Sequence, residues 1–188
     1  AQKCARRVQM HLFHHSRDLD IANCCVTIML QLLDKLKPSP EMPAQVKAVL
    51  VEWHQSRQKV CEKLLQVAYA EGKALVNRVL NGGSVPPKLQ NNEWLKRMQQ
   101  AGIYLRWFAC SVVKDDYKEI LQSGQKAFPA ATAFYYLWTS VEDYILEHWC
   151  EFLKRLQPSH LSLHFDGVRV SSDVSEDVAK IIQESEEH

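Results

Sequence analysis

Long apolar runs, the Cys-x-x-Cys spacing and a strong net charge of either sign are missing from this 188-residue sequence. No apolar run approaches the roughly 18 residues that a helix needs to cross a bilayer, which disfavours a membrane anchor. None of the six cysteines forms a Cys-x-x-Cys pair, so a zinc ribbon is disfavoured as well. The formal net charge is +1, so there is no overall basic field for nucleic acid, although a local basic groove is compatible with that average.

The composition is that of an ordinary globular protein, with 46% hydrophobic and 24% charged residues. The length is sufficient for a core, and we expect a single domain over residues 1–188. Most cysteines sit inside apolar helical patterns, where a free thiol behaves as a small buried side chain, and this favours a reducing compartment. We therefore expect an intracellular protein in a reducing compartment, such as the nucleus or the cytoplasm. The chain opens at Ala1 and closes on a charged segment, so we also expect a fragment of a longer polypeptide.

Apolar residues recur at helical spacing along most of the chain. The run from Val46 to Trp53 is typical of one face of an amphipathic helix. An Asn-Gly-Gly turn at residues 81–83, followed by two prolines, is a strong helix stop. The pattern predicts helices over residues 22–36, one or two over 44–80, then 91–122 and 130–156, and a last amphipathic helix after residue 173.

One short stretch, SLHFDGVRV at residues 162–170, alternates apolar and polar residues and predicts a β-strand. A strand needs a partner, and the best candidate is the segment HLFHHSRDLD at residues 11–20. Pairing the two segments would bring Asp18 or Asp20 close to Asp166.

The expected fold class is therefore α+β and dominated by helix. A small antiparallel sheet, with strands near residues 10–20 and 160–171, would be interrupted in the sequence by a helical insertion. The alternative is an all-α bundle with one hairpin at the Asp-Gly pair of residues 166–167.

Two carboxylates from distant segments that meet on neighbouring strands make a hard-oxygen site for Mg²⁺. Two such ions can activate an attacking hydroxyl and stabilise the leaving oxygen on phosphorus. Like charges this close resist joint ionisation without a cation, so the metal would also stabilise the site. Gly167, directly after Asp166, would let a nucleic-acid backbone approach the strand closely. Asp18 and Asp166 are the candidate catalytic and metal-binding pair, with Asp20 as a further ligand.

A second candidate site lies in the stretch YAEGKALVNRVLNGG, at residues 69–83. Lys73, Asn77 and Asn81 recur every four residues and share one helical face, and a pair of glycines follows them. A lysine on this stripe is a suitable point charge for a triphosphate. Residues a turn or two further along would then contact the base.

Together these segments resemble the core of a family A-type DNA polymerase, in the divergent form found in viruses, mobile elements and protist genomes. RDLDIANCC resembles the family's first motif, a strand that runs into a helix, with Asp18 at the catalytic position and Asp20 and Asn23 after it. The stretch from Tyr69 to Gly82 resembles the second motif, R-x3-K-x3-[FY]-x3-Y-G, with tyrosine at the arginine position and asparagine at both aromatic positions. SLHFDGVRV resembles the third motif, a hydrophobic strand that carries the second catalytic aspartate.

The resemblance implies a palm-like part, residues 1–37 and 125–188, and a fingers-like helical insertion, residues 44–122. It implies template-dependent DNA synthesis by a two-metal mechanism, with Mg²⁺ as cofactor and a DNA primer-template and a deoxynucleoside triphosphate as partners. The rest of a longer polypeptide would supply the thumb and any exonuclease domain. The implied site residues are Asp18, Asp166 and Asp20 for catalysis and metal, Lys73, Asn77, Asn81 and Asn23 for the nucleotide, and Gly82, Gly83, Gly167 and Arg106 for nucleic acid.

Each of these residues also has a structural interpretation. Asp18 and Asp20 are suitable N-caps for a following helix, and Asp166 begins a strong hairpin-turn signal. Lys73 is an ordinary solvated helix charge, and Arg106, beside aromatic residues, would either contact a phosphate or extend its charged end to water. The corresponding alternative function is a non-catalytic helical interaction module or a degenerate polymerase relative, which the near-zero net charge favours.

Overall fold

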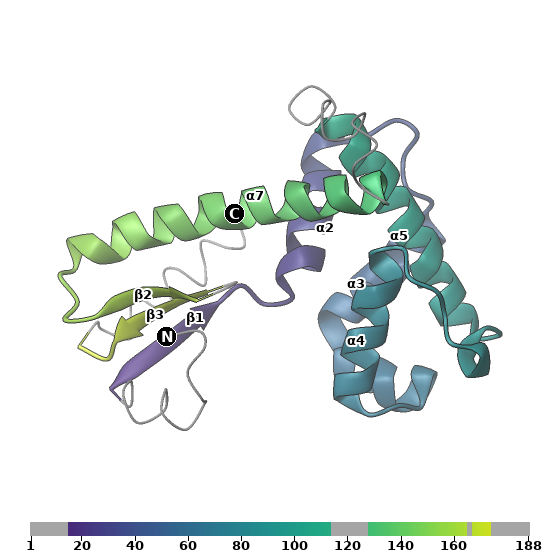
Figure 1. Cartoon of the computed structure of the whole chain (residues 1–188), viewed down its shortest axis with the longest axis horizontal. Coiled ribbons are helices and arrows are strands. Elements are labelled where there is room, and N and C mark those ends of the chain that lie inside the picture. Colours follow the sequence, from purple (N-terminus) through teal and green to yellow (C-terminus); the bar gives the residue numbers. More distant parts are fainter. Residues whose placement is uncertain (1–14, 114–127, 165–166, 174–188) are drawn as a thin grey trace. The chain divides into compact units, whose positions relative to one another are not determined.

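The computed structural model describes residues 15–113, 128–164 and 167–173. The chain falls into two units, one formed by residues 1–24 with 141–188 and the other by residues 25–140. The first unit holds a small β-sheet, and the second holds most of the helices (Figure 1). Within the described residues, no helix is both long and apolar enough to cross a membrane.

The helical unit is built from amphipathic segments that each bury one face. Its core includes Leu50 and Trp53 from one helix and Met98, Leu105 and Phe108 from another, all at most 2% exposed. These positions are three or seven residues apart within each helix, so they lie on one face. The helices of the chain are α2 (Cys24–Leu36), α3 (Ala44–Lys59), α4 (Tyr69–Leu80), α5 (Glu93–Val112) and α7 (Pro129–Arg155), with a short 3₁₀ turn, η2 (Pro87–Leu89), before α5.

The predicted helical stretch over residues 44–80 is broken near its middle. Ser56 departs from helical backbone angles, a π-helical turn η1 (Val60–Leu65) follows, and Gln66 adopts a left-handed conformation with φ 52°. Cys61, within η1, is completely buried, and its Sγ lies less than 3.0 Å from where a Cβ on Gly72 would stand. The break therefore lets the Cys61 thiol pack directly on the glycine of α4.

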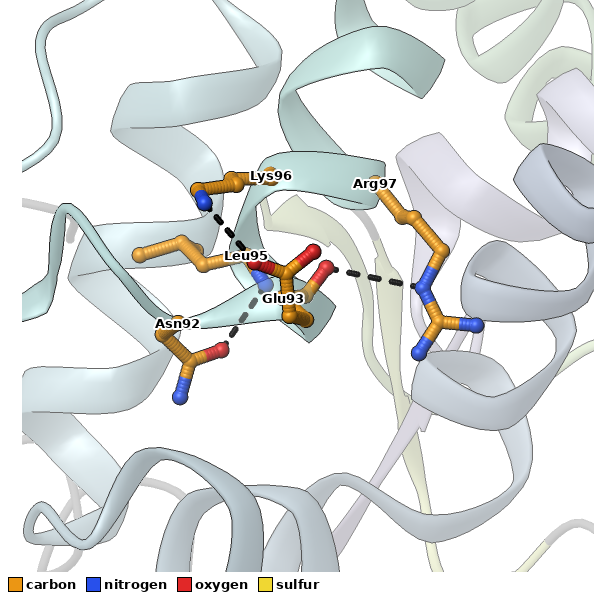
Figure 2. Close-up of polar contacts among 5 residues, drawn as sticks. All are labelled: Asn92, Glu93, Leu95, Lys96 and Arg97. Atoms are coloured by element: carbon orange, nitrogen blue, oxygen red, sulfur yellow. Dashed lines mark hydrogen bonds and ion pairs between the residues drawn. The ribbon is translucent and has the colours of Figure 1, made fainter.

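Polar side chains at the N-cap and in the first turn fix the start of α5 (Figure 2). The Oδ1 atom of Asn92 accepts a hydrogen bond from the backbone N–H of Leu95 at 2.9 Å, which satisfies a donor that the first turn leaves unpaired. Glu93 adds a negative charge to this first turn, where the helix dipole favours it. Lys96 donates to the Glu93 carboxylate at 2.7 Å and thereby lowers the pKa of Glu93.

The sheet of the first unit is antiparallel, with strand order β1-β3-β2. Its strands are β1 (Ser16–Asp20), β2 (Leu161–His164) and β3 (Gly167–Ser171). The predicted pairing of the segment that carries Asp18 and Asp20 with the stretch at residues 162–170 is confirmed for the part that forms β3. The prediction of one continuous strand over residues 162–170 is wrong, because β2 and β3 are antiparallel to each other and His164 pairs with Gly167. The alternating stretch is therefore divided between two strands, with β2 ending at His164 and β3 beginning at Gly167.

A helix-dominated α+β fold with a small antiparallel sheet is therefore confirmed, and the three-stranded sheet does not fit the all-α alternative. Asp166, the predicted last helix and residues 114–122 of the predicted third helix lie outside the described residues. The division into palm-like and fingers-like parts remains a prediction.

Candidate functional site: the aspartate face of the sheet

The sheet surface that carries the predicted aspartates is polar. Side chains alternate along a strand, so Asp18 and Asp20 share one face and Leu19 lies on the other. The register places Arg169 opposite Asp18 and Gly167 opposite Asp20. Directly opposed residues of an antiparallel pair lie on the same face, so these four residues form one surface, here called the aspartate face. Both aspartates are exposed.

The other surface of the sheet is apolar. Val168 and Val170 of β3 are only 1% and 2% exposed. The second half of α7 belongs to the same unit and runs alongside the sheet in Figure 1. It buries Leu146, Trp149 and Leu153 at helical spacing. These apolar rows supply the core of this unit, whereas the aspartate face carries its charges.

Asp18 is held by a bidentate ion pair with Arg169. Arg169 Nε donates to Asp18 Oδ1 at 2.5 Å, and Arg169 Nη2 donates to Asp18 Oδ2 at 2.9 Å. The Arg169 side chain is 14% exposed, whereas that of Asp18 is 53% exposed. The hydrogen bonds to Asp18 raise the pKa of Arg169, burial opposes this, and the negative charges of Asp18 and Asp20 add to it. The guanidinium therefore stays charged and keeps both oxygens of Asp18 engaged.

Asp20 lies over Gly167. A Cβ at residue 167 would stand less than 3.0 Å from Oδ1 of Asp20 and 2.5 Å from the backbone oxygen of Leu19. The missing side chain of Gly167 therefore makes room for β1 and for the Asp20 carboxyl group. The close approach of β1 accounts for a glycine at this position without any contact to nucleic acid. The predicted nucleic-acid contact of Gly167 stays a prediction.

The turn after β1 is anchored in the interior. Ile21 is 4% exposed, and its backbone oxygen accepts a hydrogen bond from the N–H of Cys24 at 3.2 Å. Asn23 adopts φ 56°, a left-handed conformation that asparagine tolerates better than most residues. The buried thiol of Cys24 donates to Oε1 of Glu142 on α7 at 2.9 Å. These contacts fix the end of β1, where Asp20 lies, whereas the predicted nucleotide-binding role of Asn23 stays a prediction.

A second polar cluster lies at the far end of β3. Ser171 Oγ donates to the carboxylate of Asp173 and accepts a hydrogen bond from the backbone N–H of His160 at 3.3 Å. The backbone N–H of Ser159 also donates to Asp173, at 3.2 Å. The hydrogen bond from Ser171 is the main cause that lowers the pKa of Asp173. These hydrogen bonds link the residues just before β2 to the end of β3.

The predicted nucleotide-binding residues lie on α4 in the helical unit. Lys73, Asn77 and Asn81 are all exposed and follow one another at four-residue spacing. The Nδ2 atom of Asn81 donates to the backbone oxygen of Asn77 at 2.8 Å. Gly82 follows with φ 91°, and the N–H of Gly83 donates to a carbonyl of α4. The Asn-Gly-Gly turn therefore ends this helix, as its sequence predicts.

Arg106 of α5 supports the same helix end. Its Nη1 donates to the backbone oxygens of Leu80 and Val79 at the end of α4. Gly82 and Gly102 lie against its guanidinium. Burial lowers the pKa of Arg106, but a guanidinium remains charged at neutral pH. A positive charge at a helix C-terminus is favourable, so Arg106 has a structural role, and its predicted nucleic-acid contact stays a prediction.

The aspartate face supplies part of a cation site. Asp18 and Asp20 bring hard carboxylate oxygens, which suit Mg²⁺, to one exposed surface. No group of three or more His, Cys, Asp or Glu that could hold a metal occurs in residues 15–113, 128–164 and 167–173. A further ligand would have to come from elsewhere, and the sequence offers Asp166, directly before Gly167 and outside the described residues.

The sequence does not single out two residues that shape this surface, Arg169 and Glu142. Arg169 stands two positions after Gly167, and alternation of side chains along a strand assigns both residues to one face. Nothing in the sequence distinguishes Glu142 from the solvent-facing acidic residues of α7.

Comparison with protein-family models, with curated proteins and with solved structures finds no match to this chain. Function is therefore inferred from the residues and geometry of the chain alone.

Proposed function

We propose that the chain is the palm and fingers core of a template-dependent DNA polymerase that uses two Mg²⁺ ions. The supporting observation is the pairing of β1 with β3. It joins segments so distant that Asp18 and Arg169, which contact each other, are 151 residues apart in the sequence. β1 brings two exposed aspartates, and β3 begins directly after Asp166.

Asp20 is the better candidate for the β1 ligand than Asp18. Asp20 is opposite Gly167, which follows Asp166 in the sequence, whereas Asp18 is opposite Arg169, two residues further along β3. Both oxygens of Asp18 already accept hydrogen bonds from Arg169. The proposal therefore gives the metal to Asp20 and Asp166 and an auxiliary role to Asp18.

In the proposed reaction, the 3′ hydroxyl oxygen of a primer attacks the α-phosphorus of a deoxynucleoside triphosphate, a phosphodiester bond forms and pyrophosphate leaves. Mg²⁺, when bound, supplies Lewis acidity at the attacking and leaving oxygens. Asp20 and Asp166 would hold the ions.

Primer extension by the longer protein tests this proposal. Asp20→Asn and Asp166→Asn should each lower the rate of incorporation at least about a hundredfold. Each substitution removes a carboxylate that would hold the ions, and so weakens the electrostatic stabilisation of the transition state. Asp143→Asn is the matched control, since Asp143 is an exposed carboxylate of α7 in the same unit, and its rate should not change. Incorporation that survives both test substitutions contradicts the proposal.

A second candidate function is a non-catalytic helical interaction module. The bidentate Asp18–Arg169 pair favours it, because this contact gives one of the two aspartates a structural partner. Arg106 also has a structural partner, the end of α4. A folded wild-type protein that neither binds Mg²⁺ nor extends a primer would select this function.

A further inference from the structure

A cavity of about 280 Å³ lies between the end of α2 and the start of α3, within the helical unit. This volume is just below the range of about 300–1,000 Å³ that is usual for drug-sized ligands, so the cavity suits a molecule of amino-acid size. Part of its lining is apolar, since Leu33 is only 6% exposed and Met42 packs against the core. The rest of the lining carries charges of both signs.

The segment that joins α2 to α3 is held in place beside this cavity. The backbone N–H of Lys37, directly after α2, donates to the backbone oxygen of Leu33 at 3.1 Å. The hydroxyl group of Tyr104 on α5 donates to the backbone oxygen of Pro40 at 2.5 Å. The segment is therefore fixed at its start and in its middle, and the cavity has a defined wall.

The charged side chains of the lining differ in their partners. Lys47 forms an ion pair with Asp34. Lys37 and Glu41 line the same cavity, yet in the part of the chain that the structure describes neither side chain has an ion-pair or hydrogen-bond partner. Burial raises the pKa of Tyr104, and the negative charge of Glu41 adds to this, so the Glu41 carboxylate lies near the hydroxyl that holds the joining segment.

We propose that this cavity binds a small zwitterion with an apolar side chain, of the class of the aliphatic α-amino acids. Two lysines and two carboxylates line the cavity, so an ion of one sign would leave an opposite charge uncompensated. A zwitterion offers its carboxylate to Lys37 and its ammonium group to Glu41, through charge-assisted hydrogen bonds. Its side chain would lie on Leu33 and Met42. The inference is independent of the proposed polymerase function, because no residue of the aspartate face lines this cavity.

The experiment titrates L-leucine into the whole protein and follows the methyl resonance of Met42 by NMR, assigned by its loss in Met42→Leu. We expect a saturable shift. Lys37→Gln and Glu41→Gln should each weaken binding at least about tenfold, because each removes one charge-assisted hydrogen bond. Lys35→Gln is the matched control, since Lys35 is an exposed lysine in the last turn of α2 that does not line the cavity, and its affinity should not change.

Three analogues of leucine test the parts of the ligand separately. Isocaproate lacks the ammonium group, isoamylamine lacks the carboxylate, and glycine lacks the apolar side chain. Each should bind at least about tenfold more weakly than leucine. Circular dichroism checks that every variant is folded.

Each of three results would overturn the inference. The first is the absence of a saturable shift with leucine in the folded wild type. The second is an affinity for isocaproate or isoamylamine equal to that for leucine, which would show that the cavity binds a simple ion. The third is an unchanged affinity for leucine in both Lys37→Gln and Glu41→Gln.

Discussion

Asp20 and Gly167 face each other across β1 and β3, and the Asp20 carboxyl group occupies the space that a Cβ at residue 167 would need. Gly167→Ala should therefore lower the free energy of unfolding by about 1–3 kcal/mol, the usual cost of overpacking. Urea denaturation followed by circular dichroism measures the change.

Ser162→Ala is the matched control for this substitution. Ser162 lies opposite Arg169 on the other side of β3, so it belongs to the same surface. Its truncation adds no atoms there, although it removes the hydrogen bond between the Ser162 hydroxyl and Nε2 of His160 at 3.1 Å, so Ser162→Ala should cost less than Gly167→Ala. Equal stability of Gly167→Ala and the wild type would contradict the close approach of Asp20.

Gly72→Ala tests the contact between η1 and α4. In an ordinary helix this substitution stabilises the folded state by up to about 1 kcal/mol. Here we expect a loss of about 1–3 kcal/mol, because the new Cβ collides with Sγ of the buried Cys61. Thermal unfolding of the single variants Gly72→Ala and Cys61→Ala and of the double variant measures the coupling. The double variant should be more stable than the sum of the single losses predicts, and strict additivity would rule out the contact.

Asn92→Ala should lower the free energy of unfolding by about 1 kcal/mol, since it removes the N-cap of α5. It also removes the hydrogen bond that Asn92 Nδ2 donates to the backbone oxygen of Leu64 at 2.7 Å. Asn91→Ala is the control, because Asn91 is exposed and precedes the cap by one residue. A chemical-denaturation midpoint that moves equally in both variants would refute the capping role.

The Ser171–Asp173 contact predicts a pH dependence. Its lowered pKa means that Asp173 stabilises the folded state above the ordinary aspartate pKa of about 3.9, and that this contribution is lost as the pH falls through the lowered value. NMR titration of the carboxyl carbon should show a pKa below the ordinary range in the wild type. In Ser171→Ala the pKa should rise toward that range, and an unchanged value would show that the hydroxyl is not its cause.

The sequence predicts most of the helices because their apolar residues recur at helical spacing, as between Val46 and Trp53. It also predicts that the segment around Asp18 pairs with the segment after Asp166. It does not predict where β2 ends, because apolar and polar residues alternate through both strands, and only the backbone pairing shows that β2 ends at His164 and β3 begins at Gly167.

The partners of the charged side chains are harder to predict. Arg169 pairs with Asp18 because the strand register places the two residues opposite each other. A register shift of one residue would place one of the two side chains on the other face of the sheet. Arg106 contacts the carbonyl oxygens of Leu80 and Val79 through the packing of α4 against α5, which depends on the tertiary fold. Neither the spacing nor the residue types around these arginines contain that information.

The pairing of β1 with β3 has a consequence for the order of folding during synthesis. The helical unit, residues 25–140, is complete in sequence well before the ribosome reaches β3. β1 must wait for a strand that is made some 150 residues later, and such distant pairings form slowly. The aspartate face is therefore assembled last, so a nascent or truncated chain that stops before β3 would contain the helices but would lack this surface.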